Sequence, residues 1–137
     1  MATPFRVQRI VEFSDTDVAG IVHFARFFCF MEAAEHAFWR SLGLSVKMDW
    51  EGEHLGFPRV SANCDYLRPA KFEDELTIEV SVAKVGSKSV SFSFRVLKDE
   101  VELALGQIST VCCRVRPGLP LESCVIPDAI REKLVNP

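Results

Sequence analysis

Residues 11–42 read VEFSDTDVAGIVHFARFFCFMEAAEHAFWRSL, a polar loop followed by a long amphipathic segment. Residues 14–20 are rich in Ser, Asp, Thr and Gly, which favour turns. Residues 25–42 predict one helix, because large apolar side chains recur there every three or four residues. This apolar stripe comprises Phe27, Phe30, Met31, Ala34, Phe38 and Leu42. The other half of the helical wheel carries Glu32, Glu35, His36 and Arg40.

Apolar and polar residues alternate on both sides of this helix, which is the pattern of half-buried strands. The expected strands are residues 5–13, 60–67, 76–83, 90–96 and 101–115, and residues 128–134 predict a short terminal helix. A strand, one long helix and four strands in meander give an α+β fold, with one antiparallel sheet and a helix on one face. One helix cannot cover five strands, and sheet edges need partners, so we expect a homodimer or larger oligomer.

The composition is that of an ordinary globular protein, with 48% hydrophobic and 26% charged residues. A length of 137 residues predicts a single domain, residues 1–137. The formal net charge of −3 gives no reason to expect nucleic acid or an anionic membrane as a partner. No apolar stretch approaches the length of a membrane span or of a secretory signal, so we expect a cytoplasmic protein.

Five cysteines occur, an odd number, and none forms a CxxC pair or a Cys/His cluster with zinc spacing. Neither a disulfide framework nor a metal site is therefore expected. Reduced and mostly buried thiols are the expectation for Cys29, Cys64, Cys112, Cys113 and Cys124.

Asp15 and Asp17 stand just before Gly20 and the start of the helix. Local chemistry leaves several roles open for them. Each carboxylate could cap backbone N–H groups of the loop or helix, or could form a solvated turn. Two carboxylates without further oxygen ligands are weak evidence for a metal site. A catalytic role is the remaining possibility.

The stretch from Val11 to Leu42 resembles the opening of the 4-hydroxybenzoyl-CoA thioesterase family of hotdog proteins. The shared pattern is a strand, Asp-x-Asp-x-x-Gly, an aliphatic residue, Val, an aromatic residue and a long helix. The resemblance implies a five-stranded antiparallel sheet wrapped around that helix, and no cofactor. It also implies acyl-CoA sites at the interface of subunits paired edge to edge, in a homodimer or homotetramer. The family's catalytic carboxylate corresponds to Asp17, which leaves Asp15 a structural role.

The chemistry agrees with that assignment. A thioester needs a carboxylate that either attacks it or activates water, and donors for the developing oxyanion. The helix start after Asp17 supplies free N–H groups, so we expect the N–H of Phe24 to form the oxyanion hole, with His23 beside it. His23 is a second candidate, as general acid for the leaving thiolate; the alternative is a structural role at the junction of loop and helix.

Four residues are candidates for substrate binding. Glu32 on the helix and Asn63 on a strand correspond to pocket positions, while Lys88 and Ser89 resemble the strand that contacts CoA in the family. For each, the alternative is a solvated surface position. Arg68, Arg114 and Arg116 are further possible phosphate partners.

Two other functions stay open at this stage. One is a hotdog hydratase or dehydratase, in which Asp17 and His23 would act as a pair. The other is a non-catalytic module that binds acyl thioesters, in which the acid would be dispensable. The identity of the acyl group does not follow from the sequence.

Overall fold

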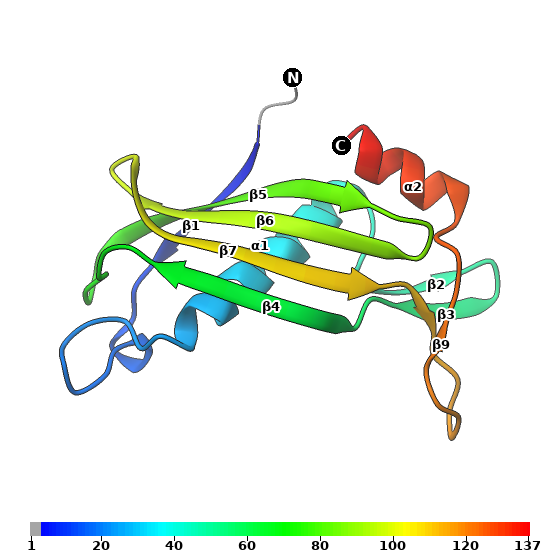
Figure 1. Cartoon of the computed structure of the whole chain (residues 1–137), viewed down its shortest axis with the longest axis horizontal. Helices are drawn as coiled ribbons and strands as arrows, with labels where there is room; N and C mark the ends of the chain where they lie inside the picture. Colours follow the sequence, from blue (N-terminus) through cyan, green and yellow to red (C-terminus); the bar gives the residue numbers. More distant parts are fainter. Residues whose placement is uncertain (1–3) are drawn as a thin grey trace.

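A five-stranded antiparallel sheet curves around one long helix, α1 (Arg26–Ser41), in the computed structural model, which describes residues 4–137. Residues 1–3 of the predicted domain lie outside the described residues. Across the sheet the strands follow the order β1 (Phe5–Ile10), β5 (Glu75–Val85), β6 (Ser89–Lys98), β7 (Val101–Val111) and β4 (Arg59–Tyr66) (Figure 1). The α+β hotdog architecture expected from the sequence is confirmed.

The simple meander expected after the helix is wrong in one respect. Strands β5, β6 and β7 follow one another, but β4 pairs with β7 and forms the far edge of the sheet. The chain after β4 therefore crosses to β5 on the other side of β6 and β7. The N–H groups of Leu67 and Arg68 donate to the carbonyl of Leu103, at 2.8 and 3.1 Å, and fix the start of this crossing.

The predicted apolar stripe of α1 faces the sheet and is buried apart from Leu42, which is half-buried. Glu35, expected on the polar half of the helix, is also fully buried, because it lies between the indole of Trp39 and the guanidinium of Arg59. Helix and sheet are in tight contact at Gly106. A Cβ there would lie 2.2 Å from Met31 Sδ, so the position accommodates no side chain without a shift of Met31.

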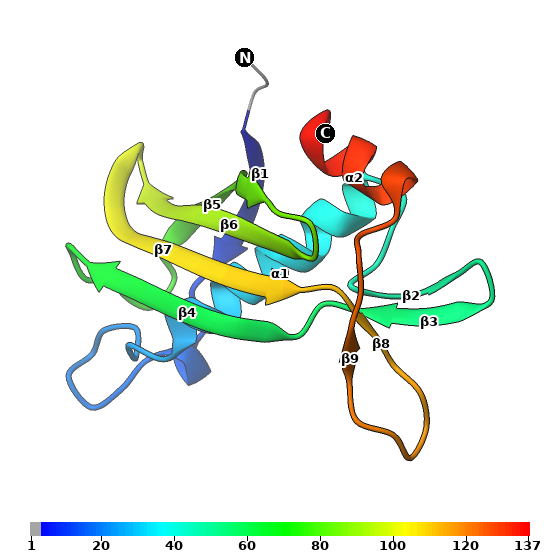
Figure 2. The ribbon, with the colours of Figure 1, turned by 45° about the vertical axis from the view of Figure 1, so that its right-hand side comes forward.

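A second, smaller sheet was not predicted. It consists of β2 (Lys47–Trp50), β3 (Glu53–Gly56), β8 (Cys113–Arg114) and β9 (Glu122–Ser123), and it projects from one end of the molecule (Figure 2). The predicted strand 101–115 thus divides at Cys112 between two sheets. The terminal helix α2 (Asp128–Val135) is present as expected, near the C-terminal end of α1 (Figure 2).

All five cysteines are free thiols, and three of them, Cys112, Cys113 and Cys124, are buried as expected; Cys29 is exposed. The Sγ atoms of Cys112 and Cys124 lie 3.6 Å apart. Burial and the neighbouring thiol raise the pKa of Cys112 to about 12, and both side chains belong to the core. No helix in the described part of the chain is both long and apolar enough to cross a membrane.

Candidate active site

Asp17 lies in a tight turn before α1. The segment between β1 and α1 forms the blue loop at the lower left of Figure 1. The turn is closed by a bridge between Thr16 and Val22, and the Asp17 N–H donates to the carbonyl of Ile21 at 2.9 Å. Gly20 has a φ of 79°, which favours glycine and lets its N–H return to the Asp17 carbonyl. The turn holds the half-buried side chain of Asp17 at a defined place before the helix.

One oxygen of the Asp17 carboxylate has a protein partner. Oδ1 accepts the Ala19 N–H at 2.9 Å. Within residues 4–137 no protein donor reaches Oδ2. The carboxylate is therefore oriented by its own turn and still presents one oxygen for other chemistry.

Asp15 is fully buried and anchors this loop to the helix. Its Oδ1 accepts Nε and Nη2 of Arg26 at 3.0 and 2.7 Å, and its Oδ2 accepts the Glu12 N–H at 2.9 Å. Arg9 adds a longer ion pair at 3.4 Å. Burial opposes ionisation, but these donors outweigh it and hold the pKa of Asp15 below its ordinary value. The structural role expected for Asp15 agrees with this geometry.

The peptide between His23 and Phe24 is oriented by the first turn of the helix. The His23 carbonyl accepts the Arg26 N–H at 2.9 Å, so it points along α1. The N–H of a trans peptide points the opposite way. The Phe24 N–H is thus directed off the helix N-terminus, and no acceptor within residues 4–137 takes it. This is the arrangement that an oxyanion hole requires.

A groove of about 510 Å³ runs past these groups. Its walls are mostly apolar, and its charged members are Asp17 and Arg68. The lining residues are Asp17, Ile21, Val22, Phe24, Phe27, Tyr66, Leu67, Arg68 and Pro69. The groove therefore combines a carboxylate, the start of a helix and an apolar wall in one place.

His23 does not line this groove. Its Nδ1 accepts the Ala25 N–H at 3.1 Å, and its ring stacks on Phe24 with centroids 4.6 Å apart. An imidazole that accepts through Nδ1 carries its proton on Nε2 when neutral. This geometry favours the structural alternative, in which His23 satisfies a free N–H at the helix start.

The four predicted binding residues do not converge on Asp17 within one protomer. Glu32 is exposed on α1 and pairs with Arg59 at 3.5 Å. Asn63 pairs with Gln107, on the face of the sheet away from α1, because its neighbour Cys64 pairs with Gly106 on the helix side. Asn63 lines a separate shallow hollow there.

Lys88 and Ser89 lie at the opposite end of the sheet from Asp17. Ser89 pairs with Val111, beside the start of β4 at Arg59, whereas Tyr66 at the end of β4 touches the Asp17 groove. The length of β4 separates the two ends by roughly 20 Å at about 3.3 Å per residue. Within this chain, Lys88 and Ser89 therefore lie far from the Asp17 groove.

Glu35 places a buried carboxyl group in the middle of helix α1. Glu35 accepts the Trp39 indole N–H and a guanidinium N–H of Arg59, both at 3.2 Å. Burial raises the pKa of Glu35, and the charge of Arg59 offsets this only in part. The cluster lies outside the Asp17 groove.

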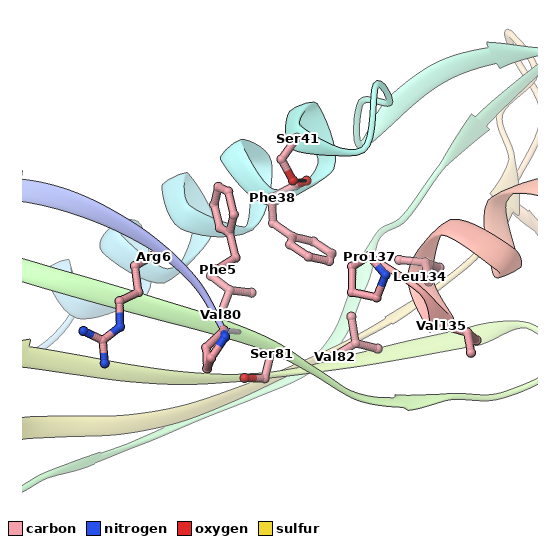
Figure 3. Close-up of a pocket in the computed structure, with 11 residues that line it drawn as sticks. Phe5, Arg6, Phe38, Ser41, Val80, Ser81, Val82, Leu134, Val135 and Pro137 are labelled. Atoms are coloured by element: carbon pink, nitrogen blue, oxygen red, sulfur yellow. Dashed lines mark hydrogen bonds between the residues drawn. The ribbon is translucent and has the colours of Figure 1, made fainter. Parts of the chain in front are cut away.

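Another hollow, of about 530 Å³, opens at the far end of α1 between β1, β5 and α2 (Figure 3). Its walls include Phe5, Phe38, Val82 and Leu134. Arg6 at its rim is already paired with Glu79 and Glu100, both at 2.9 Å. This hollow offers no free catalytic group. In the described range 4–137 no three His, Cys, Asp or Glu residues are placed to hold a metal ion.

Two members of the site were not identified as such from the sequence. Tyr66 donates its hydroxyl to the Phe24 carbonyl at 2.8 Å and packs edge-on against Phe27. Arg68 was named only as one of several possible phosphate partners. The signal for both is their place at the end of a predicted strand, just before Pro69, where the strand leaves the sheet.

Comparison with known proteins agrees with the fold. Residues 11–134 match the model of the thioesterase-like superfamily. A 1,4-dihydroxy-2-naphthoyl-CoA hydrolase of Trichodesmium erythraeum is 33% identical over 97 residues, 71% of this chain and 70% of that protein. The acyl-CoA thioesterase YbgC of Haemophilus influenzae is 28% identical over 102 residues, 74% of this chain and 75% of that protein.

Among solved structures, a gentisyl-coenzyme A thioesterase superposes with a TM-score of 0.82 at 28% identity, over 94% of this chain and 98% of the other. These similarities bear out the resemblance drawn from the sequence. The chain therefore belongs to the thioesterase-like superfamily, as a hotdog-fold protein of the thioester hydrolase class.

Proposed function

We propose that this protein is an acyl-CoA thioesterase, which hydrolyses a CoA thioester to the free acid and CoA, with Asp17 as its catalytic carboxylate. The observation that carries the proposal is that Asp17 and Phe24, whose N–H has no protein acceptor, line the same groove. The relatives named above act on CoA thioesters according to their names. The site has the two groups that this reaction needs.

Two routes of hydrolysis fit the geometry of Asp17. In one, the carboxylate attacks the thioester carbonyl, expels the CoA thiolate and leaves an anhydride that water then opens. In the other, the carboxylate takes a proton from water as the water attacks the same carbon. In both, the carbonyl oxygen gains negative charge, and the outward Phe24 N–H and the helix N-terminus stabilise it.

The role proposed for His23 is a capping one, because its Nδ1 is engaged by the Ala25 N–H. The same contact argues against a hydratase or dehydratase, which would need His23 and Asp17 to face one substrate. His23 does not line the groove that Asp17 lines. Protonation of the departing thiolate is then left to water.

The assembly that we propose is a homodimer joined through β4, or a homotetramer built from two such dimers. Strand β4 is an edge of the sheet, and seven of its eight residues are exposed. Val60 is 64% exposed, and Leu67 just beyond the strand is 48% exposed. An edge strand with unpaired backbone groups and exposed apolar side chains favours pairing with a second strand.

Antiparallel pairing of two β4 strands about a two-fold axis would place the Arg59 end of one protomer beside the Tyr66 end of the other. The end that carries Lys88 and Ser89 in one protomer would then approach the Asp17 groove of the other. This supports the expected location of the sites at subunit interfaces, and it accounts for the separation of these residues within a protomer.

The proposal is tested with purified protein and a panel of acyl-CoA thioesters, by following both thiol release and the interconversion of 3-hydroxyacyl- and enoyl-CoA. We expect thiol release that falls about 10²–10⁴-fold in Asp17→Asn, the range of a lost catalytic base. Asp99→Asn is the matched control, because Asp99 is exposed in the β6–β7 turn and does not line the groove. Binding of acyl-CoA without turnover in either assay would instead identify a non-catalytic module.

A further inference from the structure

The groove beside Asp17 contains a single cationic residue, Arg68. Any CoA thioester brings several negative charges on its phosphates, and Asp17 itself repels them. The chain as a whole is acidic, with a net charge of −3. A site for such a substrate therefore needs a local cation, and Arg68 is the one that the groove presents.

Arg68 is held firmly in place by backbone contacts. Its N–H donates to the carbonyl of Leu103 at 3.1 Å, and its Nη1 donates to the carbonyl of Glu102 at 2.6 Å. A guanidinium has five N–H donors, so most of them stay available. The hydrogen bond to Glu102 restricts this exposed side chain before any ligand binds, which lowers the entropic cost of binding.

The positive charge of Arg68 is not neutralised. Within residues 4–137 no carboxylate lies within ion-pair distance of it, in contrast to most other arginines of the protein. Arg114 and Arg116, the other possible phosphate partners named from the sequence, both form ion pairs. Arg114 pairs with Glu53 and Glu122 at 3.0 and 3.2 Å, and Arg116 reaches the same two carboxylates at 3.7 and 3.4 Å.

We infer that Arg68 binds the phosphate group attached to the pantetheine arm of the substrate. The inference rests on the proposed function and specifies how its carrier is recognised. Arg68 shares one groove with Asp17, so the phosphate nearest to the thioester along the arm is the one that it meets. A planar guanidinium fork matches two phosphate oxygens at once, and the interaction is charge-assisted.

The test compares three thioesters of one acyl group, carried on CoA, on 4′-phosphopantetheine and on pantetheine. In Arg68→Ala we expect KM to rise about 10- to 100-fold for the first two, the range of lost hydrogen bonds to a charged group. For the pantetheine thioester, which carries no phosphate, the KM of Arg68→Ala should equal that of the wild type. Arg68→Lys keeps the charge without the fork and should recover part of the affinity.

The matched control is Lys71→Ala, an exposed cation in the same connection that does not line the groove. It should leave KM unchanged for all three thioesters. An equal rise in KM for all three thioesters in Arg68→Ala, or no rise for any of them, would overturn the inference. A penalty restricted to acyl-CoA would also overturn it, because the contact would then lie with the nucleotide phosphates.

Calorimetric titration with CoA and with pantetheine separates this inference from the catalytic proposal, because it needs no turnover. Weaker CoA binding by Arg68→Ala, with pantetheine binding unaffected, supports the inference even if no thioester is hydrolysed. If the wild-type protein hydrolyses thioesters but Arg68→Ala binds CoA as tightly as wild type, the catalytic proposal stands and the role of Arg68 falls.

Discussion

Tyr66, at the end of the edge strand β4, donates its hydroxyl to the carbonyl of Phe24 at 2.8 Å. The bond joins residues 42 positions apart in the sequence and ties the sheet edge to the peptide that follows the proposed oxyanion donor. The ring of Tyr66 also packs edge-on against Phe27, with centroids 5.4 Å apart. The edge strand and the start of α1 are thus positioned together.

Tyr66→Phe removes this hydroxyl and keeps the ring. We expect kcat to fall about 2- to 10-fold, because a neutral hydrogen bond contributes about 0.5–1.5 kcal/mol to the position that it fixes. KM should change little, and the urea midpoint should fall only by the contribution of this one hydrogen bond, since the ring packing remains. Steady-state kinetics and urea unfolding of the variant provide the measurement. An unchanged kcat would mean that the helix start is positioned without Tyr66.

His23→Ala removes the acceptor for the Ala25 N–H. The expected result is a loss of about 0.5–2 kcal/mol in the free energy of unfolding, typical of a lost helix cap. Turnover should stay near that of the wild type, measured by thiol release. If His23→Ala instead lost as much turnover as Asp17→Asn, the imidazole would be part of the catalytic machinery, and the general-acid hypothesis would be restored.

Asp15→Asn removes a buried charge that Arg26 and the Glu12 N–H stabilise. We expect a loss of about 1.5–3 kcal/mol in the free energy of unfolding at neutral pH, as for hydrogen bonds to a charged group. The folded-state pKa of Asp15 is lowered, so its contribution is complete above the ordinary value of 3.8 and is lost as pH falls through the folded pKa. The difference between variant and wild type should therefore shrink on acidification. Urea unfolding at a series of pH values measures it, and a constant difference would contradict the assignment.

Glu35→Gln should show the opposite dependence on pH. Burial raises the folded pKa of Glu35, so its ionisation costs stability as pH rises from the ordinary value of 4.5 through the folded pKa. Arg59, with Glu32 and His36 beside it, offsets part of that cost. The variant should gain stability relative to wild type as pH rises. A relative loss with rising pH would show that the ion pair with Arg59 outweighs burial.

Val60→Asp places a charge on the exposed edge of β4. If two copies pair through this edge, we expect the dissociation constant of the dimer to rise by about tenfold or more, because an unpaired charge at an interface costs more than about 1.4 kcal/mol. Light scattering over a range of concentrations measures the change. Val135→Asp, at the exposed end of α2, which packs on β5, is the control. Equal behaviour of the two variants would exclude β4 as the interface.

The sequence predicted the elements whose apolar residues recur at a regular spacing. It was less informative about elements whose position depends on tertiary contacts. The helix was expected at residues 25–42 and runs over Arg26–Ser41, because its apolar stripe is continuous. The small sheet escaped prediction, since β8 and β9 have two residues each and depend on pairing across the chain. The pairing of β4 with β7 is likewise a long-range choice that alternation does not encode.

The same distinction explains the site. Asp17, Phe24 and the buried Asp15 lie within one contiguous segment, so a local motif was enough to suggest them. The face of the sheet on which Asn63 lies could not be predicted, because β4 is exposed along nearly its whole length and its pattern has no buried face to define the register. Glu35 appeared polar on a helical wheel, which cannot show that Arg59 arrives from a distant strand to meet it.

The anchoring of the loop by Asp15 and Arg26 has a consequence for how such an enzyme can diversify. The groups that would perform the chemistry are held mostly by residues close in sequence, while one wall of the groove comes from Leu67, Arg68 and Pro69, just beyond a separate strand end. Substitutions in that strand end can alter which thioester fits without disturbing the turn that carries Asp17. Specificity and reactivity are therefore free to evolve at different rates in this protein.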